Sequence, residues 1–416
     1  MEAGAHVGLR LFWQRKTAAT GLALLAALPL AGCSTLPGWM VLQGQSRVTD
    51  HQHFDNAPIQ RAAVPTALPA APLHKQPTLQ WPNGADTAAV EAMASANHTL
   101  ALLVVQRGVL VYERYFNGHS RQAISASMSV AKSVVSALLG IAQGEGHIGS
   151  VDEPITRWLP ELLANDARFA QITLRHLLLM RSGIAFSEVY RSPLSDAARF
   201  YLTDKLQAEL GRLRIDTPPD TAYRYKSGDT QLLAMALQRA VGMPLAQYAQ
   251  TRLWQPMGAE FDASWSLDST AHGQVRAFCC LNATAVDFAR FGLVFLNGGH
   301  YNGRQIVPAD WVQDSTAVQQ RPGVDAAIQR NVEAPSLGHM AYYAWQWRRA
   351  AMPNTAPGPL PVGQLRPASN DFYAQGLYGQ FIYIAPDSQT VVVRLGSATG
   401  GFNWPAWLGE LARRNP

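Results

Sequence analysis

Two strand-like stretches lie at opposite ends of the chain, and a long helical stretch separates them. Residues 99–106 and 109–116 are rich in β-branched, aromatic and other apolar side chains around a short Arg-Gly link, which indicates a hairpin. Residues 379–385 and 390–396 show the same pattern around a Pro-Asp turn. Residues 150–310 are mostly helical in pattern. The sequence therefore predicts an α+β fold, with one antiparallel sheet built from both chain ends and an inserted helical subdomain.

Several helices have clear boundaries in the sequence. An apolar side chain recurs every three to four residues within them, and a Gly closes most of them. Asp229 and Thr284 each precede such a pattern and are expected to cap it through a side-chain oxygen. The expected helices cover residues 129–143, 230–241, 285–296 and 404–414.

Residues 1–32 have the pattern of a secretory signal peptide. Basic residues precede an apolar stretch over 17–30, which is short for a bilayer span. The stretch ends in Leu30-Ala31-Gly32-Cys33, which resembles the lipobox of bacterial lipoproteins. The resemblance implies a lipidated Cys33 and a chain anchored in the cell envelope, facing the periplasm. Because Ser34 and not Asp follows the cysteine, we expect sorting to the outer membrane.

Composition divides the remaining chain into a tether and a body. Residues 33–83 are rich in Pro, Ala, Gln and Thr, which predicts a semi-extended tether. Residues 84–416 have a globular pattern and should form one domain. The chain is 48% hydrophobic and 15% charged, which excludes an intrinsically disordered protein. Its basic residues are spread out without a long run, so no nucleic-acid surface is expected despite a net charge of +5.

Cysteine usage predicts no disulfide. If Cys33 carries lipid, only the neighbours Cys279 and Cys280 remain. Adjacent cysteines rarely pair, because the ring that the bond would close is strained. We therefore expect both to be small, buried apolar residues.

A Ser-x-x-Lys motif stands at the start of the helix expected over 129–143. Ser129 and Lys132 are three positions apart and so lie on one helix face, where the amine can reach the hydroxyl. A serine needs a base beside it to act as a nucleophile, and a lysine serves only where burial or cationic neighbours lower its pKa. The helix N-terminus also offers a backbone N–H to an oxyanion. A helix-capping serine beside a solvated lysine would give the same motif.

A second polar segment precedes the helix expected over 230–241. Tyr225 and Ser227 form a Tyr-x-Ser motif on the loop that leads into it. A phenol beside a lysine ammonium can share its proton and act as a general base. Ser227 could relay a proton or bind substrate. The alternative is a core-packed tyrosine and a polar residue at a helix entry.

A third segment, residues 372–380, combines aromatic residues with Gly376 and Gly379 just before the last hairpin. Glycine in a strand lets a ligand or another backbone approach closely. The edge of such a strand can supply a second oxyanion donor.

The order and spacing of these three segments resemble those of the class C β-lactamase and penicillin-binding-protein-like serine hydrolases. Within that group the chain looks most similar to the aminohexanoate-oligomer hydrolase and esterase branch. The resemblance covers about residues 85–412 and includes further family-like segments at 151–160, 176–183, 281–292 and 303–311. It implies the β-lactamase/transpeptidase-like fold.

The resemblance also implies a role for each site residue. Ser129 would be the acylated nucleophile and Lys132 the base beside it, while Tyr225 would carry the proton to the leaving group and later activate water. The backbone N–H groups of Ser129 and Leu377 would form the oxyanion hole. The residues expected to bind substrate are Ser227, Gln375, Gly376, Tyr190 and Trp345.

The third segment departs from the family pattern. Where the lactamases carry a cation followed by a hydroxyl, this chain has Ala374 and Gln375. These side chains offer no charge to the carboxylate of a β-lactam. Neutral esters or amides are therefore the expected substrates, unless an arginine from elsewhere replaces the missing cation.

The leading hypothesis is a serine hydrolase that cleaves an ester or amide without a cofactor or metal. The chain lacks a Gly-x-Ser-x-Gly nucleophile elbow, a zinc-hydrolase His-Glu-x-x-His motif and a Gly-rich dinucleotide fingerprint. The first alternative is a β-lactamase or D,D-peptidase acting on cell-wall peptides. The second is a non-catalytic envelope lipoprotein that uses the same fold for binding.

Overall fold

A computed structural model describes residues 45–70, 78–190, 192–317, 332–336, 339–350 and 369–415. All of them belong to one compact unit that spans residues 36–416. The predicted signal peptide, the lipidation site at Cys33 and the Pro-rich loop over 351–367 lie outside the described residues. Within the described part of the chain, no helix is long and apolar enough to cross a bilayer.

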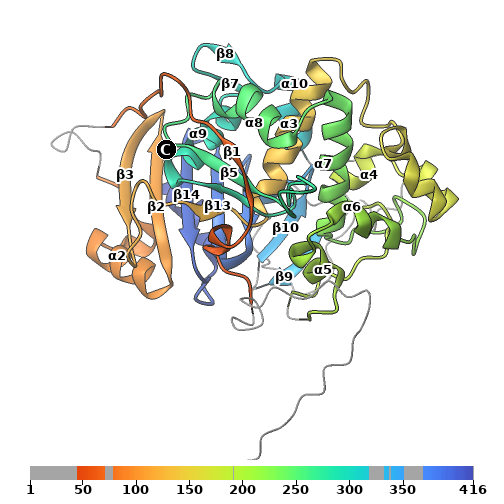
Figure 1. Ribbon diagram of the computed structural model, residues 1–416. Coiled ribbons are helices and arrows are strands. Elements are labelled where there is room, and N and C mark those ends of the chain that lie inside the picture. The colour runs from red at the N-terminus through yellow and green to blue at the C-terminus, as the bar shows by residue number, and fades with distance from the viewer. Residues whose placement is uncertain are drawn as a thin grey trace, which may run out of the picture. The chain divides into compact units, whose positions relative to one another are not determined.

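The principal sheet has eight strands, all antiparallel, in the order β3-β2-β14-β13-β12-β11-β10-β9 (Figure 1). The hairpin β2–β3 from the first part of the chain pairs directly with the last strand, β14, so strands from both chain ends lie side by side near one edge of the sheet. The strands are β2 (Thr99–Gln106), β3 (Val109–Tyr115), β9 (Val332–Ser336), β10 (His339–Tyr343), β11 (Arg348–Ala350), β12 (Phe372–Gly376), β13 (Gln380–Ala385) and β14 (Thr390–Gly396).

Helices lie on both faces of this sheet, and most of them come from the part of the sequence between β3 and β9 (Figure 1). They are α2 (Thr87–Ala96), α3 (Val130–Gly144), α4 (Leu174–Leu178), α5 (Asp196–Leu202), α6 (Leu206–Glu209), α7 (Ser227–Val241), α8 (Leu245–Ala249), α9 (Ala285–Leu296), α10 (Ala309–Thr316) and α11 (Trp404–Arg414). A second, smaller sheet has the order β1 (Asn56–Ile59), β5 (Ala263–Ser266), β6 (Leu281–Ala283) and β4 (Ser125–Ala126). In addition, β7 (His300–Tyr301) pairs with β8 (Arg304–Gln305). The predicted α+β architecture is confirmed.

Alternation along the central strands assigns one face to each layer of helices. On β13, Ile382 and Ile384 enter the large core that includes α3, α7 and α9. Phe381 and Tyr383 point the other way and pack with Trp404 and neighbouring residues of α11. Successive side chains of a strand point to opposite faces, so these apolar runs are buried on both sides.

A buried glutamine, Gln346, joins helices α3, α4 and α7. Gln346 lies in the turn between β10 and β11, and its side-chain nitrogen donates to the carbonyl oxygens of Leu177 and Leu178 at the end of α4, at 3.2 and 3.1 Å. Its side-chain oxygen accepts from Thr230 on α7, and its backbone oxygen accepts from Ser133 on α3. These bonds fix α3 and α7 relative to each other.

Helix α7 begins earlier than the sequence suggested. Asp229 was expected as its N-cap, but α7 starts at Ser227 and Asp229 lies buried in the first turn. Lys226 takes the extended N-cap conformation instead. The Glu188 carboxylate, far away in sequence, accepts the Ser227 N–H at 2.7 Å and supplies the anion that a helix N-terminus favours.

The segment before the body also differs from the prediction. Residues 33–83 were expected to be a tether, but residues 45–70 contain β1 (Asn56–Ile59), which pairs with β5 (Ala263–Ser266) at the edge of the small sheet. Ile59 is fully buried, and Asp50 accepts a hydrogen bond from Tyr201 of α5 at 2.8 Å. The prolines hid the strand, because Pro58 fits an edge strand but weakens the strand pattern.

This packing predicts that residues 45–70 contribute to stability. Ile59→Ala should destabilise the protein by about 2–5 kcal/mol, because it removes a buried side chain and leaves a cavity. Val64→Ala is the matched control, since Val64 is 85% exposed in the same segment. Urea unfolding of both variants tests this. Equal unfolding midpoints for Ile59→Ala and wild type would contradict this packing and support the prediction of a tether.

Candidate active site

The Ser-x-x-Lys motif lies where a strand of the small sheet turns into α3. Strand β4 (Ser125–Ala126) pairs with β6 (Leu281–Ala283), and Ser129 directly precedes α3. Met128 has a φ of 48°, a left-handed conformation that costs energy for a non-glycine residue. The turn leaves Ser129 half-buried at the helix N-terminus, where a developing oxyanion meets positive partial charge.

Lys132 is the buried polar centre of the site. Its side chain is 1% exposed, and its Nζ lies 3.2 Å from Ser129 Oγ, 3.2 Å from Ser227 Oγ and 2.7 Å from the Phe278 carbonyl oxygen. The predicted contact between Lys132 and Ser129 is therefore present. A solvated lysine, which was the alternative for this motif, is contradicted by the burial.

Tyr225 completes the predicted group. Lys132 Nζ lies 5.1 Å from the centre of its ring, and the Arg348 guanidinium lies 5.2 Å from the same centre. Tyr343 meets the ring edge-on at 5.8 Å. The structure thus brings Tyr225 to the Ser129–Lys132 pair through its contact with Lys132, although Tyr225 lies far from both in the sequence.

Glu188 is a site residue that sequence reasoning missed. Ser227 Oγ donates to Glu188 Oε1 at 2.6 Å, and the half-exposed Tyr190 donates to the same oxygen at 2.7 Å. Glu188 lies a few residues after the Arg-Ser-Gly segment that follows α4. That segment is family-like in sequence, but no local pattern marks the glutamate itself. A chain of hydrogen bonds therefore runs from Lys132 through Ser227 to Glu188.

A second, fully buried polar cluster lies beneath α7. Lys226 Nζ donates to Ser182 Oγ at 2.9 Å, and Ser182 Oγ donates to Asp229 at 2.7 Å. Gly183 next to it has a φ of 73°, and a side chain there would clash with the Thr217 carbonyl. This cluster fixes the backbone on both sides of Ser227. Burial raises the pKa of Asp229 to about 6, against the lowering effect of Lys226.

The third segment approaches the nucleophile as predicted. A methyl group on Gly376 would lie 2.5 Å from the Ser127 carbonyl oxygen, so only glycine fits at this crossing. Leu377 follows it and packs with Ala126 and Met128. This contact places the predicted oxyanion residue Leu377 beside the Ser129 turn. Gln375, the residue before Gly376, is half-buried on β12.

The neighbouring strand β11 places a cation beside Tyr225. Ala374 is buried in the core, whereas Arg348 on β11 pairs in register with Tyr373 on β12. Its guanidinium stands over the rings of Tyr225 and Tyr343. The sequence could not reveal this, because the register of β11 against β12 depends on the connection between them.

Trp345 lies elsewhere than the prediction put it. It packs against Trp311 at 4.9 Å and under the Arg175 guanidinium, beside a cavity lined by Gly140 and Gly144. These glycines are near the C-terminal end of α3, whereas Ser129 precedes its first residue. The 15-residue helix is about 22 Å long. Trp345 therefore belongs to the core behind the site and not to its substrate pocket.

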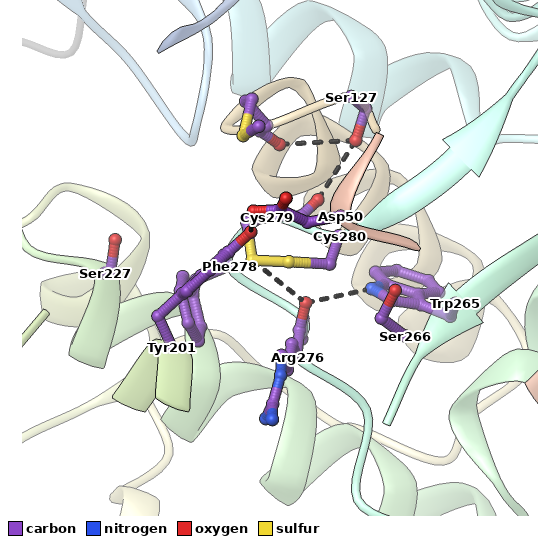
Figure 2. Close-up of a disulfide and its surroundings, with 12 residues drawn as sticks. Asp50, Ser127, Tyr201, Ser227, Trp265, Ser266, Arg276, Phe278, Cys279 and Cys280 are labelled. Carbon is purple, nitrogen blue, oxygen red and sulfur yellow. Dashed lines mark hydrogen bonds between the residues drawn. A yellow bond between two sulfur atoms is a disulfide. The ribbon is translucent and has the colours of Figure 1, made fainter. Parts of the chain in front are cut away.

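The two cysteines also contradict the prediction. Cys279 and Cys280 form a disulfide with a Cα–Cα distance of 3.7 Å (Figure 2). They are buried, as expected, but they are paired. The Arg276 carbonyl oxygen accepts from both cysteine N–H groups, and this turn of the chain brings the two sulfurs together. In the described part of the chain, no group of three His, Cys, Asp or Glu residues is placed to hold a metal ion.

The geometry combines a hydroxyl beside a buried amine, a tyrosine ring beside that amine, and backbone donors at a helix N-terminus. The sequence profile of the Beta-lactamase family matches residues 85–406. The chain belongs to this family, and it is a serine hydrolase of the kind that cleaves amides or esters.

Known proteins resemble it over between 38% and 88% of its length. The 6-aminohexanoate-dimer hydrolase of Paenarthrobacter ureafaciens is 25% identical over 321 residues, which are 74% of this chain and 73% of that protein. Esterase EstB of Burkholderia gladioli is 28% identical over 175 residues, 38% of this chain and 44% of the esterase. A Bacillus anthracis structure described provisionally as a 6-aminohexanoate-dimer hydrolase has a TM-score of 0.69 and 25% identity, covering 88% of this chain and 91% of that one.

The buried Asp229 predicts a pH-dependent stability. Its pKa rises from an ordinary 3.8 to about 6 on folding, so the folded protein holds a proton that the unfolded chain releases between pH 4 and 6. Unfolding is therefore favoured as pH rises through this window, by at most about 1.4 kcal/mol per pH unit. Asp229→Asn should lose this slope. Thermal unfolding at pH 4 to 7 checks it, and parallel curves for variant and wild type would contradict the assignment.

Proposed function

We propose that the protein hydrolyses a linear amide or a small carboxylic ester through an acyl-enzyme on Ser129. The observation that carries the proposal is the contact of 3.2 Å between Ser129 Oγ and the buried Lys132 Nζ. A buried amine with a hydroxyl in reach is the arrangement that makes a serine nucleophilic. The family membership supports the same chemistry.

The hydrogen bonds around Lys132 fix the orientation of its amine. As the proposed base, Lys132 reacts in its neutral form, which has two N–H donors and one lone pair. The Phe278 carbonyl oxygen can only accept, and Ser227 Oγ gives its own proton to Glu188, so both take an N–H from Lys132. The lone pair is then left for Ser129. In the first step the Ser129 proton moves to Lys132 Nζ while Oγ bonds to the substrate carbonyl carbon.

Tyr225 is placed to finish the first half-reaction. Its ring lies beside Lys132 and Arg348. The phenol passes a proton to the leaving amine or alcohol as the carbonyl–leaving-group bond breaks. Water then attacks the acyl-enzyme, gives a proton back through the same groups and releases the acid and Ser129.

The developing oxyanion would be held by the backbone N–H groups of Ser129 and Leu377. Donors of this kind contribute about 2.7–4 kcal/mol each in comparable sites. The close approach of Gly376 to the Ser127 backbone supports this arrangement, since it brings the two segments side by side.

We infer the class of substrate from the segment that carries Glu188. Tyr190 is about half-exposed, and Val189 and Leu194, close to it in the sequence, are exposed apolar side chains. Exposed apolar side chains on this segment suit an uncharged acyl or alkyl chain. The relatives named for a linear amide substrate and for esterase activity support the same substrate classes.

A serine-to-alanine pair tests the nucleophile. Ser129→Ala should lower kcat/KM for a short-chain nitrophenyl ester by at least about a thousandfold, since it removes the atom that is acylated. Ser136→Ala is the matched control, because Ser136 is a buried serine on the same helix and its hydroxyl has no hydrogen-bond partner. Initial rates on the full chain decide the matter.

Three outcomes of this assay carry different meanings. Loss of activity in Ser129→Ala alone supports the proposal. Equal rates in wild type and Ser129→Ala would contradict it and favour a binding lipoprotein. Arg348 gives a specific reason to include a chromogenic cephalosporin, because a cation near Tyr225 could pair with a β-lactam carboxylate. Turnover of that compound in preference to esters would favour the β-lactamase alternative.

We also propose that Cys33 is lipidated and holds the protein in the cell envelope. The lipobox-like segment supports this, and the Cys279–Cys280 disulfide is typical of an oxidising compartment such as the periplasm. Cys33→Ala should move the protein from the membrane fraction to the soluble fraction and abolish labelling by a radioactive fatty acid. Labelling that persists in the variant would contradict the assignment.

A further inference from the structure

Successive carbonyl groups of one short segment hold the Ser-x-x-Lys motif from both ends. The Phe278 oxygen accepts from Lys132 Nζ at 2.7 Å. The next oxygen, that of Cys279, accepts from Ser127 Oγ at 3.0 Å (Figure 2). The Leu281 oxygen accepts from the Ser127 N–H at 2.8 Å. The segment thus contacts the residue two before the nucleophile and the amine three after it.

The disulfide lies inside this segment. The ring that it closes contains the peptide bond between Cys279 and Cys280, so the Cys279 carbonyl carbon is itself a member of the ring. The Phe278 carbonyl carbon is bonded to the Cys279 nitrogen, which is bonded in turn to the ring at Cys279 Cα. The sulfur–sulfur bond therefore restricts the direction of the Cys279 carbonyl through covalent geometry. The hydrogen bond from Cys279 N–H to the Arg276 carbonyl oxygen fixes the peptide that carries the Phe278 carbonyl.

The other side of the ring is anchored to the body. The Arg276 carbonyl oxygen accepts from Cys279 N, from Cys280 N and from Trp265 Nε1, the last at 3.1 Å (Figure 2). The Ser266 N–H donates to the Cys280 oxygen at 2.9 Å. Strand β5 and the buried Trp265 thus fix one side of the ring, while the other side faces Lys132 and Ser127.

The direction of the Phe278 carbonyl matters because that oxygen is a pure acceptor. It takes one N–H of Lys132 and so fixes the orientation of the amine, which lies 3.2 Å from Ser129 Oγ. If the carbonyl turned away, the amine could rotate and lose its contact with Ser129 Oγ. The Phe278 ring, 5.7 Å from Nζ, would move with it.

We propose that the Cys279–Cys280 disulfide is a positioning element of the catalytic site, which holds the Phe278 and Cys279 carbonyl groups against Lys132 and Ser127. The proposal rests on the proposed acyl-enzyme function. The oxidised protein is the fast hydrolase, and the dithiol form is slower at the step in which Ser129 attacks.

The effect is expected on rate and not on substrate binding. Cys279 and Cys280 are buried, at 6% and 3% exposed, whereas Tyr190 is 51% exposed. Misplacement of a catalytic group by about 1 Å costs on the order of a hundredfold in rate. We therefore expect kcat to fall about ten- to a hundredfold on reduction, with KM nearly unchanged.

The experiment uses the full chain, purified in detergent, with Cys33→Ala so that the pair at 279 and 280 holds the remaining sulfhydryl chemistry. A water-soluble phosphine reduces the disulfide. The phosphine loses two electrons and takes up oxygen from water as phosphine oxide, and the water protons go to the two thiols. Intact mass, which rises by two hydrogens, reports the extent of reduction. A Cys279→Ala/Cys280→Ala variant provides the open state without reagent.

The readout is labelling by a nitrophenyl alkylphosphonate. Ser129 Oγ bonds to phosphorus as the bond from phosphorus to nitrophenolate breaks, so released nitrophenolate gives both a rate constant and a final amplitude. We expect full amplitude with a rate constant lowered about ten- to a hundredfold in the reduced protein and in the double variant. Reoxidation should restore the reduced protein, and the phosphine should leave the double variant unchanged.

The other outcomes overturn the proposal in distinguishable ways. An unchanged rate constant in both open forms shows that the disulfide does not position Lys132. A lower amplitude with an unchanged rate constant assigns the disulfide to stability alone. Oxidised protein that is labelled equally with and without Ser129→Ala overturns the acyl-enzyme function and this inference together, whereas labelling that depends on Ser129 but ignores the redox state removes only the latter.

Discussion

The burial of Lys132 is the constraint on which the site depends. An amine removed from water is costly unless its donors find acceptors. Those acceptors come from three parts of the chain: Ser129 at the start of α3, Ser227 at the start of α7, and the Phe278 carbonyl before β6. The fold must hold two helix N-termini and one loop in a single place to satisfy one side chain. The same convergence brings the lysine amine within 3.2 Å of the serine hydroxyl.

Backbone atoms do much of this work. Gln346 ties α3, α4 and α7 together largely through main-chain oxygens, and the segment from Phe278 to Leu281 reaches the nucleophile turn through its carbonyl groups. The tight crossing at Gly376 likewise depends on main-chain atoms. Such contacts put few demands on side-chain identity, so they leave little trace in a sequence.

This explains which features the sequence could predict. The terminal hairpins, the helix beginning near Ser129 and the group of Ser129, Lys132 and Tyr225 carry local patterns, and the structure has them as expected. The roles of these residues in catalysis stay predictions. Glu188, Arg348 and the pairing of β1 with β5 depend on long-range contacts that no local pattern encodes. The prediction that Trp345 binds substrate was wrong, because a cluster of aromatic residues has the same sequence pattern whether it lines a pocket or packs in a core.

Arg348 changes how this site can diversify. Arg348, which brings positive charge near Tyr225, lies on β11, while Ala374 and Gln375 of the third segment lie on β12. If one strand carried both the cation beside Tyr225 and the third-segment residues, a substitution in that segment would also disturb the surroundings of the Tyr225 phenol. In this chain the two tasks are carried by separate strands. A substitution at Gln375, which is half-buried on β12, therefore leaves the cation beside Tyr225 in place.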